Sequence, residues 1–401
     1  MKLAGRRILL GITGGIAAYK IPSLVRSLRK QGAEVRVVLT SGARAFVTPL
    51  TLETLAGAPV YSQEDFLKPQ GGKVLHIELG RWAEVIVVAP ATAAFLASLR
   101  LADASSLLVA CLLASSAPAL LFPAMNEKMW RHPATQENVR HLKDWGYTVV
   151  CPDEGPLACG EAGPGRLPAE EVILAYVRKA LSPQDLAGCK VLVTCGPTRE
   201  PVDLVRYLSN RSSGRMGLAL AQAAFERGAE VILIHGPLSV AIPPLFERIE
   251  VETAEEMRKR LLEKFPETEI LFMAAAVADY RPVVFRAEKI KKGGRLTLEL
   301  EPTPDLLSEV AARRRPGQVI VGFAAEESAR LAAEAERKLR QKDLDLVVAN
   351  PIDQPEAGFE TETNRVLILD RHGRRLELPL QPKEEIAEKI LDQVVVFREA
   401  S

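Results

Sequence analysis

The stretch from Leu121 to Trp130 places a single polar amide, that of Asn126, among apolar residues. Residues 117–123 read as a buried strand, and Asn126 follows the end of that strand, between two methionines and close to a tryptophan. In α/β proteins, small-molecule sites form at the carboxyl ends of strands, where a few polar groups lie in an apolar rim. The stretch is therefore predicted to line a small-molecule site.

Two further residues of the first half have side chains suited to acid–base chemistry. His76 begins the stretch His-Ile-Glu-Leu-Gly-Arg-Trp. Histidine titrates near neutral pH, although a lone histidine is more often structural. Cys159 lies within residues 155–166, where four glycines and two prolines predict a shaped loop over a site. A cysteine in such a loop is exposed enough to react, whereas Cys111, on a predicted helix, is typical of apolar packing.

The second half carries arginines around a turn that precedes a predicted helix. Residues 206–217 bring Ser, Asn and Gly in front of that helix. Backbone N–H groups at a helix N-terminus attract anions, and guanidinium groups strengthen the attraction. The alternative is a capped helix with solvated arginines, and the lack of a Walker Lys-Ser/Thr pair excludes an ordinary P-loop. The flanking residues are Arg199, Arg206, Arg211 and Arg215.

Asp279 and several lysines could serve the same anionic ligand. Residues 274–280 end a predicted strand in small residues and then present Asp279, which could bind Mg²⁺ or a ribose hydroxyl. A lysine-rich run, 289–292, precedes two glycines. Lys338 and Lys342 share one helical face because they are four residues apart. Taken singly, each of these lysines is more often part of a solvated surface.

The elements that must position these residues begin twice along the chain. Residues 7–13 and 190–194 predict apolar strands, each followed by a glycine-bearing turn, a helix and a second strand that starts Gly-Ala-Glu-Val. More buried strands are predicted in both halves, at 85–89, 117–122, 270–274, 319–323 and 346–349. The sequence therefore predicts an α/β protein with two doubly wound parallel-sheet domains, 1–187 and 188–401, that meet in the polar stretch 182–188.

Composition narrows the class of protein. The 401 residues exceed one core of usual size, and 47% hydrophobic with 26% charged residues is typical of a soluble globular protein. A net charge of +1 gives no overall attraction to nucleic acid, and no apolar run is long enough to span a membrane. With no evident signal peptide and five cysteines that include no Cys-x-x-Cys pair, a reducing cytoplasm is expected.

Three predicted turns of the first half could bind a phosphate. Residues 11–20 form the first strand-to-helix turn, Thr40 ends the second strand, and residues 89–92 end the next. All three fall at carboxyl ends of strands, where a doubly wound sheet binds its ligand. The Gly14-Gly15 turn lacks the Gly-x-Gly-x-x-Gly spacing, so by itself it could be only a tight turn.

In combination, the motifs of the first half resemble the flavin-dependent cysteine decarboxylases, and most closely the decarboxylase domain of bacterial bifunctional coenzyme A enzymes. The resemblance implies a flavodoxin-like domain that binds FMN, with Gly14, Thr40, Phe46, Ala89 and Thr92 at the flavin. The motifs are Gly-Gly-Ile-Ala-Ala-Tyr-Lys, Phe-Val-Thr-Pro-Leu-Thr, His-Ile-Glu-Leu-Gly, Ala-Pro-Ala-Thr, Pro-Ala-Met-Asn-x-x-Met-Trp and Ala-Cys-Gly-x-x-Gly-x-Gly-Arg.

The same resemblance implies a role for each candidate catalytic residue. In that family FMN oxidises the thiol of phosphopantothenoylcysteine to a thioaldehyde, carbon dioxide leaves, and the ene-thiolate is protonated and reduced. His76 would then assist thiol oxidation and decarboxylation, Asn126 would hold the substrate carboxylate, and Cys159 would donate the proton. Ala94, Ser105 and Ser106 depart from the usual residues of the family.

The second half resembles phosphopantothenate–cysteine ligases, with a Rossmann-like fold implied. The motifs are Thr-x-Gly-Pro-Thr-Arg-Glu, Ser-Asn-x-Ser-Ser-Gly-x-Met-Gly and Ala-Ala-Val-Ala-Asp-Tyr followed by Lys-Ile-Lys-Lys. Bacterial members use CTP to make an acyl-cytidylate, from which the amine of cysteine displaces CMP. By resemblance Lys289 helps to form this intermediate and Asn210 stabilises its carbonyl. The implied CTP site comprises Met273, Ala274, Ala275, Asp279, Lys289, Pro304, Asp305, Leu306, Leu307, Phe323, Lys338 and Lys342.

The sequence therefore predicts a bifunctional enzyme that ligates cysteine to 4′-phosphopantothenate with CTP and Mg²⁺, and then decarboxylates phosphopantothenoylcysteine with FMN. The sequence does not predict which residues bind the Mg²⁺ ion. The alternatives are a peptidyl-cysteine decarboxylase, or a non-catalytic flavoprotein regulator, fused to a nucleotide-binding domain. By analogy a homo-oligomer is expected, with trimeric decarboxylase domains and dimeric ligase domains that together make a dodecamer. Neither a nucleic-acid nor a membrane partner is expected.

Overall fold

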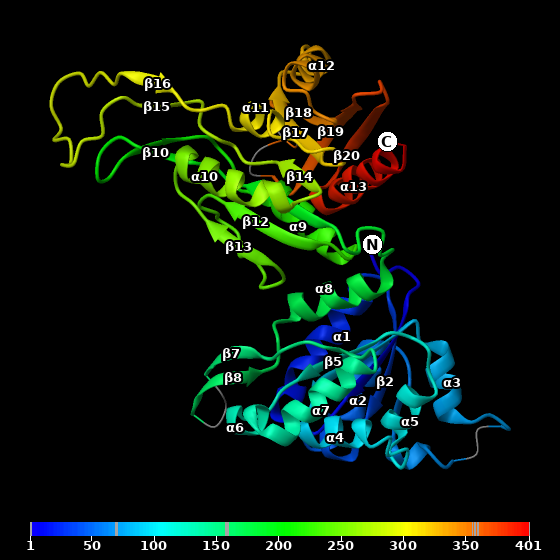
Figure 1. Ribbon diagram of the computed structural model, residues 1–401. Helices are drawn as coiled ribbons and strands as arrows, with labels where there is room; N and C mark the ends of the chain where they lie inside the picture. The colour runs from blue at the N-terminus through cyan, green and yellow to red at the C-terminus, as the bar shows by residue number, and fades with distance from the viewer. Residues whose placement is uncertain are drawn as a thin grey trace. The chain divides into compact units, whose positions relative to one another are not determined.

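In the computed structural model the chain divides into two units, Met1–Ser182 and Pro183–Ser401, each built on its own sheet (Figure 1). The structure describes residues 2–68, 71–156, 160–354, 356, 358 and 361–400. The expected fold class, two doubly wound α/β units, is confirmed. No helix within these described residues is both long and apolar enough to cross a lipid bilayer.

The first unit contains a six-stranded parallel sheet in the order β3-β2-β1-β4-β5-β6. The strands are nearly continuous apolar runs, as expected for a sheet that is covered on both faces. The order reverses between β1 and β4, and such a reversal opens a crevice at the carboxyl ends of the strands. The bounds are β1 (Arg7–Ile12), β2 (Glu34–Leu39), β3 (Val60–Ser62), β4 (Val85–Ala91), β5 (Ala119–Pro123) and β6 (Thr148–Val149).

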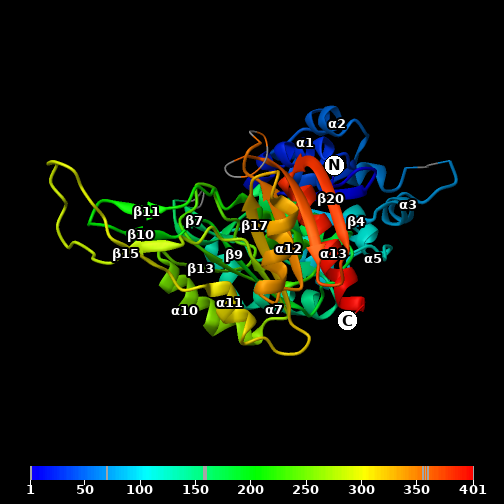
Figure 2. The ribbon, with the colours of Figure 1, turned by 90° about the horizontal axis from the view of Figure 1, so that it is seen from above.

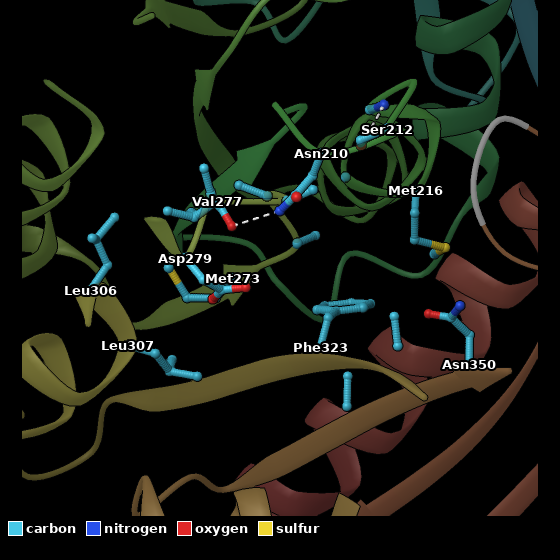
Figure 3. Close-up of a pocket in the computed structure, with 18 of the residues that line it drawn as sticks. Asn210, Ser212, Met216, Met273, Val277, Asp279, Leu306, Leu307, Phe323 and Asn350 are labelled. Carbon is cyan, nitrogen blue, oxygen red and sulfur yellow. Dashed lines mark hydrogen bonds between the residues drawn. The ribbon is translucent and has the colours of Figure 1, made fainter. Parts of the chain in front are cut away.

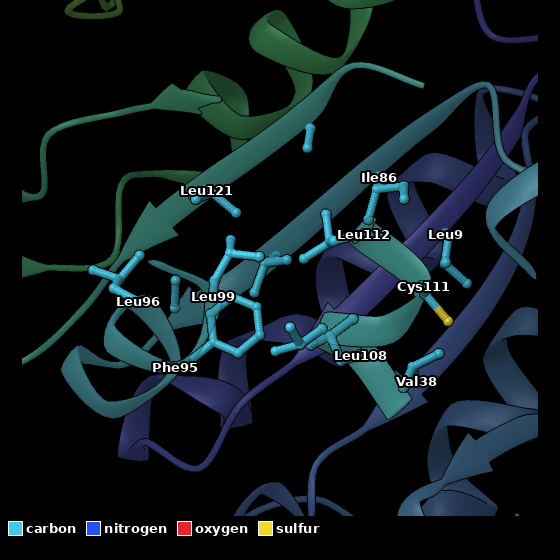
Figure 4. Packing of buried hydrophobic residues seen from close by; sticks show 14 of the residues in the cluster. Leu9, Val38, Ile86, Phe95, Leu96, Leu99, Leu108, Cys111, Leu112 and Leu121 are labelled. Carbon is cyan, nitrogen blue, oxygen red and sulfur yellow. The ribbon is translucent and has the colours of Figure 1, made fainter. Parts of the chain in front are cut away.

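Two groups of helices bury this sheet. Four helices contribute apolar residues to one cluster with Leu9, Ile86 and Leu121. These helices are α3 (Leu75–Trp82), α4 (Ala93–Arg100), α5 (Leu107–Leu113) and α7 (Pro133–Asp144). Figure 4 shows the cluster residues of α4 and α5. In the second group α1 (Ile21–Lys30) packs against α2 (Pro49–Ala56), and α8 (Glu170–Leu181) packs on α1, β4 and β5. A short helix, α6 (Glu127–Arg131), and a hairpin of β7 (Asp153–Pro156) and β8 (Ala162–Arg166) follow the carboxyl end of β5.

The second unit contains an eight-stranded sheet in the order β13-β12-β9-β14-β17-β18-β19-β20. The first six strands are parallel, and β19 and β20 extend the sheet in antiparallel fashion, which the sequence did not predict. The bounds are β9 (Lys190–Cys195), β12 (Glu230–His235), β13 (Glu247–Glu250), β14 (Ile270–Met273), β17 (Val319–Glu326), β18 (Leu346–Pro351), β19 (Thr363–Asp370) and β20 (Arg375–Pro382).

Helices cover this sheet as well. Against Leu192, Leu271 and Ile320 lies an apolar cluster that includes residues of α10 (Ala254–Lys264), α11 (Leu306–Ala311) and α12 (Leu331–Gln341). Helices α9 (Arg215–Glu226) and α13 (Lys383–Ala400) pack against each other. Two short ribbons, β10 (Arg199–Pro201) with β11 (Tyr207–Ser209) and β15 (Tyr280–Pro282) with β16 (Leu300–Pro302), extend away from the large sheet in both views (Figures 1 and 2).

The stretch after the division belongs to the second unit because Arg227 anchors it there. The backbone N–H of Leu186 donates to the carbonyl oxygen of Arg227 at 3.1 Å. The Arg227 guanidinium is only 4% exposed, forms a two-point contact with the Asp185 carboxylate and donates to Asp392 at 2.8 Å. Since Asp392 lies on α13, this one guanidinium ties residues 184–186 to both α9 and α13.

Candidate active sites

A cavity of about 840 Å³ opens in the first unit at the carboxyl ends of β1, β4 and β5. Its walls come from the turn after β1, the start of α4, the segment after β5, and strand β8. Thr13 joins the two strands between which the sheet order reverses. Its hydroxyl donates to the carbonyl oxygen of Pro90 at 2.7 Å and accepts the N–H of Thr92 at 3.0 Å. The floor of the cavity is therefore held by buried hydrogen bonds.

Gly14 is needed in this cavity because two backbones meet there. A Cβ at Gly14 would lie 2.8 Å from the backbone of Gly42, closer than real Cβ atoms come. A Cβ at Gly15 would instead lie 3.5 Å from the Thr92 side chain, an ordinary contact. The absence of a side chain at Gly14 thus brings the turn after β2 against the turn after β1.

Of the five residues expected at the flavin, Gly14 and Thr92 line the cavity. Thr92 caps α4 by accepting the N–H of Phe95 at 3.3 Å, so the start of that helix faces the cavity. The structure places the other three elsewhere. Thr40 donates its hydroxyl to the carbonyl oxygen of Ile12 at 3.3 Å, Phe46 is 41% exposed, and Ala89 is buried within β4.

Asn126 lies on the wall of this cavity with Met125 and Met129. Its Oδ1 accepts the N–H of Lys128 at 2.8 Å, which makes Asn126 the N-cap of α6. Its Nδ2 donates to Glu161 at 2.7 Å. The amide is thus oriented by its own helix, and its nitrogen already faces a carboxylate.

His76 and Cys159 do not join Asn126 in the described part of the cavity. His76 is the second residue of α3, half-buried, with its ring edge-on to Phe66 at 5.5 Å between centroids. Among the described residues, nothing hydrogen-bonds its buried Nδ1. Cys159 lies outside the residues that the structure describes, between β7 and β8.

Lys20 and Arg166 also line the cavity, and sequence reasoning did not select them. Lys20 ends the glycine-bearing turn after β1, and Arg166 is the last residue of β8. Each is the last residue of a glycine-rich motif, Gly-Gly-Ile-Ala-Ala-Tyr-Lys or Ala-Cys-Gly-x-x-Gly-x-Gly-Arg, and that position is the local signal that could have indicated them. Two cations at the rim would suit a substrate that carries a phosphate.

The second unit has a cavity of about 540 Å³ at the carboxyl ends of β9, β14 and β17 (Figure 3). Asn210 lines it, together with every residue expected at the nucleotide except Lys289. Asp279, Leu306 and Leu307 lie toward one end in Figure 3, Asn350 lies toward the other, and Phe323 lies between them. The residues gathered are Met273, Ala274, Ala275, Asp279, Pro304, Asp305, Leu306, Leu307, Phe323, Lys338 and Lys342.

Threonine side chains hold the alanine-rich loop after β14. Thr194 accepts the N–H of Ala275 at 3.3 Å, and Thr198 accepts the N–H of Ala278 at 3.0 Å. Both threonines are fully buried. The backbone hydrogen bonds between strands stop at the end of β14, and beyond it the two threonine hydroxyls accept the N–H groups of the loop. These hydrogen bonds hold the loop backbone along the cavity.

The charged residues of this cavity are placed by their own contacts. Lys338 donates to the carbonyl oxygen of Phe323, and burial lowers the pKa of its ammonium although Glu326 and Asp279 act in the opposite direction. Lys342 pairs with Asp305. Among the described residues, no three His, Cys, Asp or Glu side chains gather in a way that could hold a metal ion.

Lys383 also lines this cavity, and nothing in its local sequence indicated a role. Only 5% of the residue is exposed, and its ammonium donates to the carbonyl oxygens of Gly358 at 2.9 Å and Thr361 at 2.6 Å. Burial, with the nearby charge of Arg215, lowers the pKa of Lys383 to about 8. Of the four arginines noted in the sequence, only Arg215 lines the cavity.

Lys289 lies apart from the cavity, in the exposed segment that joins β15 to β16. The base of that segment contacts Asp203, whose carboxyl has its pKa lowered to about 2. Burial opposes this shift, but hydrogen bonds from the N–H groups of Val205, Ile290 and Arg206, with the charge of Arg206, outweigh it.

Comparison with known proteins places both halves of the chain in one kind of protein. Residues 1–182 match the family described as Flavoprotein, and residues 186–397 match the DNA/pantothenate metabolism flavoprotein C-terminal domain. The coenzyme A biosynthesis bifunctional protein CoaBC of Escherichia coli strain K12 is 43% identical over 401 residues, or 98% of each chain. CoaBC of Bacillus subtilis strain 168 is 42% identical over the same share. A crystal structure of the C-terminal domain of CoaBC is 35% identical, covers 54% of this chain and 100% of that one, and has a TM-score of 0.47.

Proposed function

This chain belongs to the family of bifunctional coenzyme A biosynthesis proteins, and we propose that it converts 4′-phosphopantothenate and cysteine into 4′-phosphopantetheine. The second unit, Pro183–Ser401, would ligate cysteine with CTP, and the first unit, Met1–Ser182, would decarboxylate the phosphopantothenoylcysteine with FMN. One observation carries the proposal: Gly14, Thr92 and Asn126 line a cavity at the carboxyl ends of the first sheet, and Asn210 with all the expected nucleotide residues except Lys289 lines one at the carboxyl ends of the second. The ligase product is the decarboxylase substrate, so the two activities in one chain would catalyse consecutive steps.

In the ligase reaction, the carboxylate of 4′-phosphopantothenate would attack the α-phosphorus of CTP. A new carboxyl oxygen–phosphorus bond forms, the bond to pyrophosphate breaks, and the acyl-cytidylate remains. The amine of cysteine then attacks the acyl carbon and releases CMP. Such chemistry depends on cations and oriented dipoles around the reacting centre. Lys338, Lys342 and Lys383 provide cations in the cavity, and Lys289 would act on the phosphates.

Asn210 is suited to stabilise the acyl carbonyl. Its Nδ2 donates to the carbonyl oxygen of Val277 at 2.9 Å, which orients the amide. An amide nitrogen has two N–H donors, so one donor is available for a substrate oxygen. A preoriented donor costs no reorganisation as negative charge develops on that oxygen.

Magnesium would bind together with the nucleotide. Mg²⁺ is usually held by one or two carboxylates and the phosphates of the substrate, not by a dedicated protein cage. Asp279, an exposed carboxylate on the cavity wall, is the candidate ligand. A site of this kind fits the lack of a three-residue metal cluster among the described residues.

The residues of the first unit fit FMN. The cavity volume of about 840 Å³ is that of a cofactor site, its walls are largely apolar, and the lack of a side chain at Gly14 lets the turn after β2 approach the turn after β1 beside it. The start of α4, capped by Thr92, offers N–H groups to a phosphate. When bound, FMN would supply the two-electron oxidation of the substrate thiol and the final reduction.

The remaining decarboxylase functions fall to the chain's own side chains. Asn126 would hold the substrate carboxylate, and its contact with Glu161 supports this role because a carboxylate already accepts from Nδ2. His76 would take the thiol proton, and Cys159 would protonate the ene-thiolate after carbon dioxide leaves. Lys20 and Arg166 would face the substrate phosphate at the rim.

We propose that the protein is a cytoplasmic homo-oligomer, in which trimeric decarboxylase domains and dimeric ligase domains combine in a dodecamer. A peptidyl-cysteine decarboxylase or a non-catalytic flavoprotein regulator is not favoured. The bifunctional relatives match along both units, and the second unit gathers the nucleotide residues in one cavity.

One anaerobic assay tests the whole proposal. Purified protein with FMN is incubated with 4′-phosphopantothenate, cysteine, CTP and Mg²⁺, and the products are read by mass spectrometry. We expect CMP, pyrophosphate, carbon dioxide and 4′-phosphopantetheine. Phosphopantothenoylcysteine without further conversion would remove the decarboxylase half, and the absence of any amide would remove the ligase half. Omission of CTP is the matched control.

A further inference from the structure

Asp203 is a buried carboxylate of the second unit to which the proposed chemistry gives no role. It lies in the turn between β10 and β11, and its side chain has no exposed surface (0%). Its Oδ1 accepts the backbone N–H groups of Val205 at 2.8 Å and Arg206 at 2.7 Å. These two hydrogen bonds shape the turn itself.

The other carboxylate oxygen contacts a segment far away in the sequence. Asp203 Oδ2 accepts the backbone N–H of Ile290 at 3.1 Å and the guanidinium of Arg206 at 2.7 Å. The same guanidinium donates to the carbonyl oxygen of Ile290 at 3.1 Å. Nearby, the N–H of Arg286 donates to the carbonyl oxygen of Val202 at 3.2 Å. The segment 286–290 is therefore anchored at both of its ends, and Asp203 with Arg206 holds both backbone groups of Ile290.

This anchor acts directly on Lys289. The N–H of Ile290 belongs to the peptide group that also contains the carbonyl of Lys289. Because a peptide group is planar, the hydrogen bond to Asp203 orients this whole unit, including the bond to the Lys289 Cα. The neighbouring residues 283–288 and 291–300 are exposed, so little packing of their own fixes the position of Lys289.

We infer that Asp203 is a positioning residue of the ligase reaction, because its carboxylate holds the Ile290 backbone and thereby places the Lys289 ammonium. The inference rests on the proposed function, in which Lys289 acts while the acyl-cytidylate forms. It requires a selective defect. Loss of the anchor slows pyrophosphate release, whereas cysteine still consumes the acyl-cytidylate once that intermediate exists.

Asp203→Asn is the informative substitution. Asparagine keeps one oxygen for the N–H groups of Val205 and Arg206, so the turn retains its acceptor. The new NH₂ group faces the Ile290 N–H and the Arg206 guanidinium, and donors do not bond to donors. We expect pyrophosphate release without cysteine to fall by about 100-fold, the scale expected for a reactive group displaced by about 1 Å. The KM for CTP should stay unchanged.

Asp345→Asn is the matched control. Asp345 is also buried, accepts the N–H of Ile320 at 2.8 Å, and pairs with Arg314 at 3.2 Å and Arg371 at 3.1 Å. A purely structural loss should therefore appear in both variants. Asp345→Asn should lower thermal stability and leave the ratio of the two half-reaction rates unchanged.

Hydrogen exchange supplies a readout that does not depend on activity. Amide exchange in the peptide that spans residues 284–292 should become faster in Asp203→Asn and stay unchanged in Asp345→Asn. If Asp203→Asn does not fold, Ile290→Pro removes the same N–H donor from an exposed segment and should give the same selective defect.

The outcomes separate the inference from the proposed function. If the parent protein releases no pyrophosphate from CTP and 4′-phosphopantothenate, the proposed ligase function is wrong and the inference fails with it. If the parent is active, unchanged exchange at 284–292 in Asp203→Asn overturns the inference. Equal losses in both half-reactions overturn it as well. A selective loss of pyrophosphate release together with faster exchange supports it.

Discussion

The amide of Asn210 donates to the main-chain carbonyl oxygen of Val277 at 2.9 Å, which joins the loop before α9 to the loop after β14 across 67 residues. The hydrogen bond is visible in Figure 3 at the wall of the nucleotide cavity. The hydrogen bond orients the Asn210 side chain between the loops that follow two neighbouring parallel strands, β9 and β14.

Asn210→Asp should separate the two ligase half-reactions. A carboxylate would repel both the Val277 carbonyl and the developing oxyanion of the acyl-cytidylate. Pyrophosphate release should continue, but amide formation should fall by the equivalent of about 2–4 kcal/mol, as for the loss of an oxyanion-hole donor. Rapid quench with separate detection of pyrophosphate and phosphopantothenoylcysteine measures both rates. An equal decrease of the two would contradict the assigned role.

Lys289→Gln should have the opposite effect. With its charge removed, pyrophosphate release from CTP and 4′-phosphopantothenate should be lost even without cysteine, because Lys289 is proposed to act on the phosphates. Decarboxylation of supplied phosphopantothenoylcysteine should survive this change and Asn210→Asp alike, and it serves as the control. Loss of both activities together would mean that the two units fold or assemble as one.

The purified protein should be yellow, and Gly14→Ala should weaken its hold on FMN. A methyl group at Gly14 would meet the backbone of Gly42 at 2.8 Å, so one of the two turns must move. The neighbouring change, Gly15→Ala, meets only a side chain at 3.5 Å and is the matched control. Absorbance near the flavin bands, before and after dialysis, gives the occupancy. Equal flavin retention in both variants would argue against the Gly14 turn as part of the site.

Cys159→Ser should block completion of the decarboxylation without preventing its start. A hydroxyl is a far weaker acid than a thiol, so the ene-thiolate should not be protonated and should accumulate. Mass spectrometry would detect it as a product that is lighter than 4′-phosphopantetheine by two hydrogen atoms. His76→Asn should act earlier and prevent reduction of the flavin. Normal product at the parent rate from Cys159→Ser would exclude the proton-donor role.

Ligase activity should decrease as the pH rises through about 8, because Lys383 loses its charge there. Its folded-state pKa is below the ordinary value of 10.5, so the ammonium is charged and attracts anions only below about pH 8. The charges that act on its pKa, besides burial, are those of Arg215, which lowers it, and Glu384, which raises it. Lys383→Arg keeps the cation and should remove the decrease in kcat/KM for CTP. Persistence of that decrease in the arginine variant would assign it to another group.

Arg227→Leu should destabilise the second unit by about 1–3 kcal/mol, because it removes the buried guanidinium that Asp185 and Asp392 share, although Lys389 still pairs with Asp392. Asp185→Asn should cost less, since Arg227 keeps Asp392. All three tryptophans lie in the first unit, so their fluorescence reports on that unit, whereas far-UV circular dichroism reports on both. During thermal unfolding of the full chain, only the circular dichroism transition of the second unit should move. A shift in the fluorescence transition would show that the units unfold together.

Local sequence determined the two doubly wound units. An apolar strand, a glycine turn and a helix can each be recognised from a short stretch of sequence, because the hydrophobic pattern that identifies each element is local. The full set of nucleotide residues was expected from the family resemblance, but the loop that carries Asp279 could be read as a ligand site from the local sequence. Ala274, Ala275 and Asp279 follow a strand, and the carboxyl ends of parallel strands meet at one edge of the sheet.

The tertiary structure decided which of these residues meet. Lys383 begins the last helix and Arg166 ends a hairpin, and only the strand order brings them to the cavities. Thr40 and Ala89 were expected at the flavin, yet the Thr40 hydroxyl donates to the carbonyl oxygen of Ile12 and Ala89 is fully buried within β4. Contacts such as that of Asp203 with Ile290 cross 87 residues, and no local pattern encodes them. They depend on which loops the crossovers place side by side, which is a property of the whole sheet and not of any one segment.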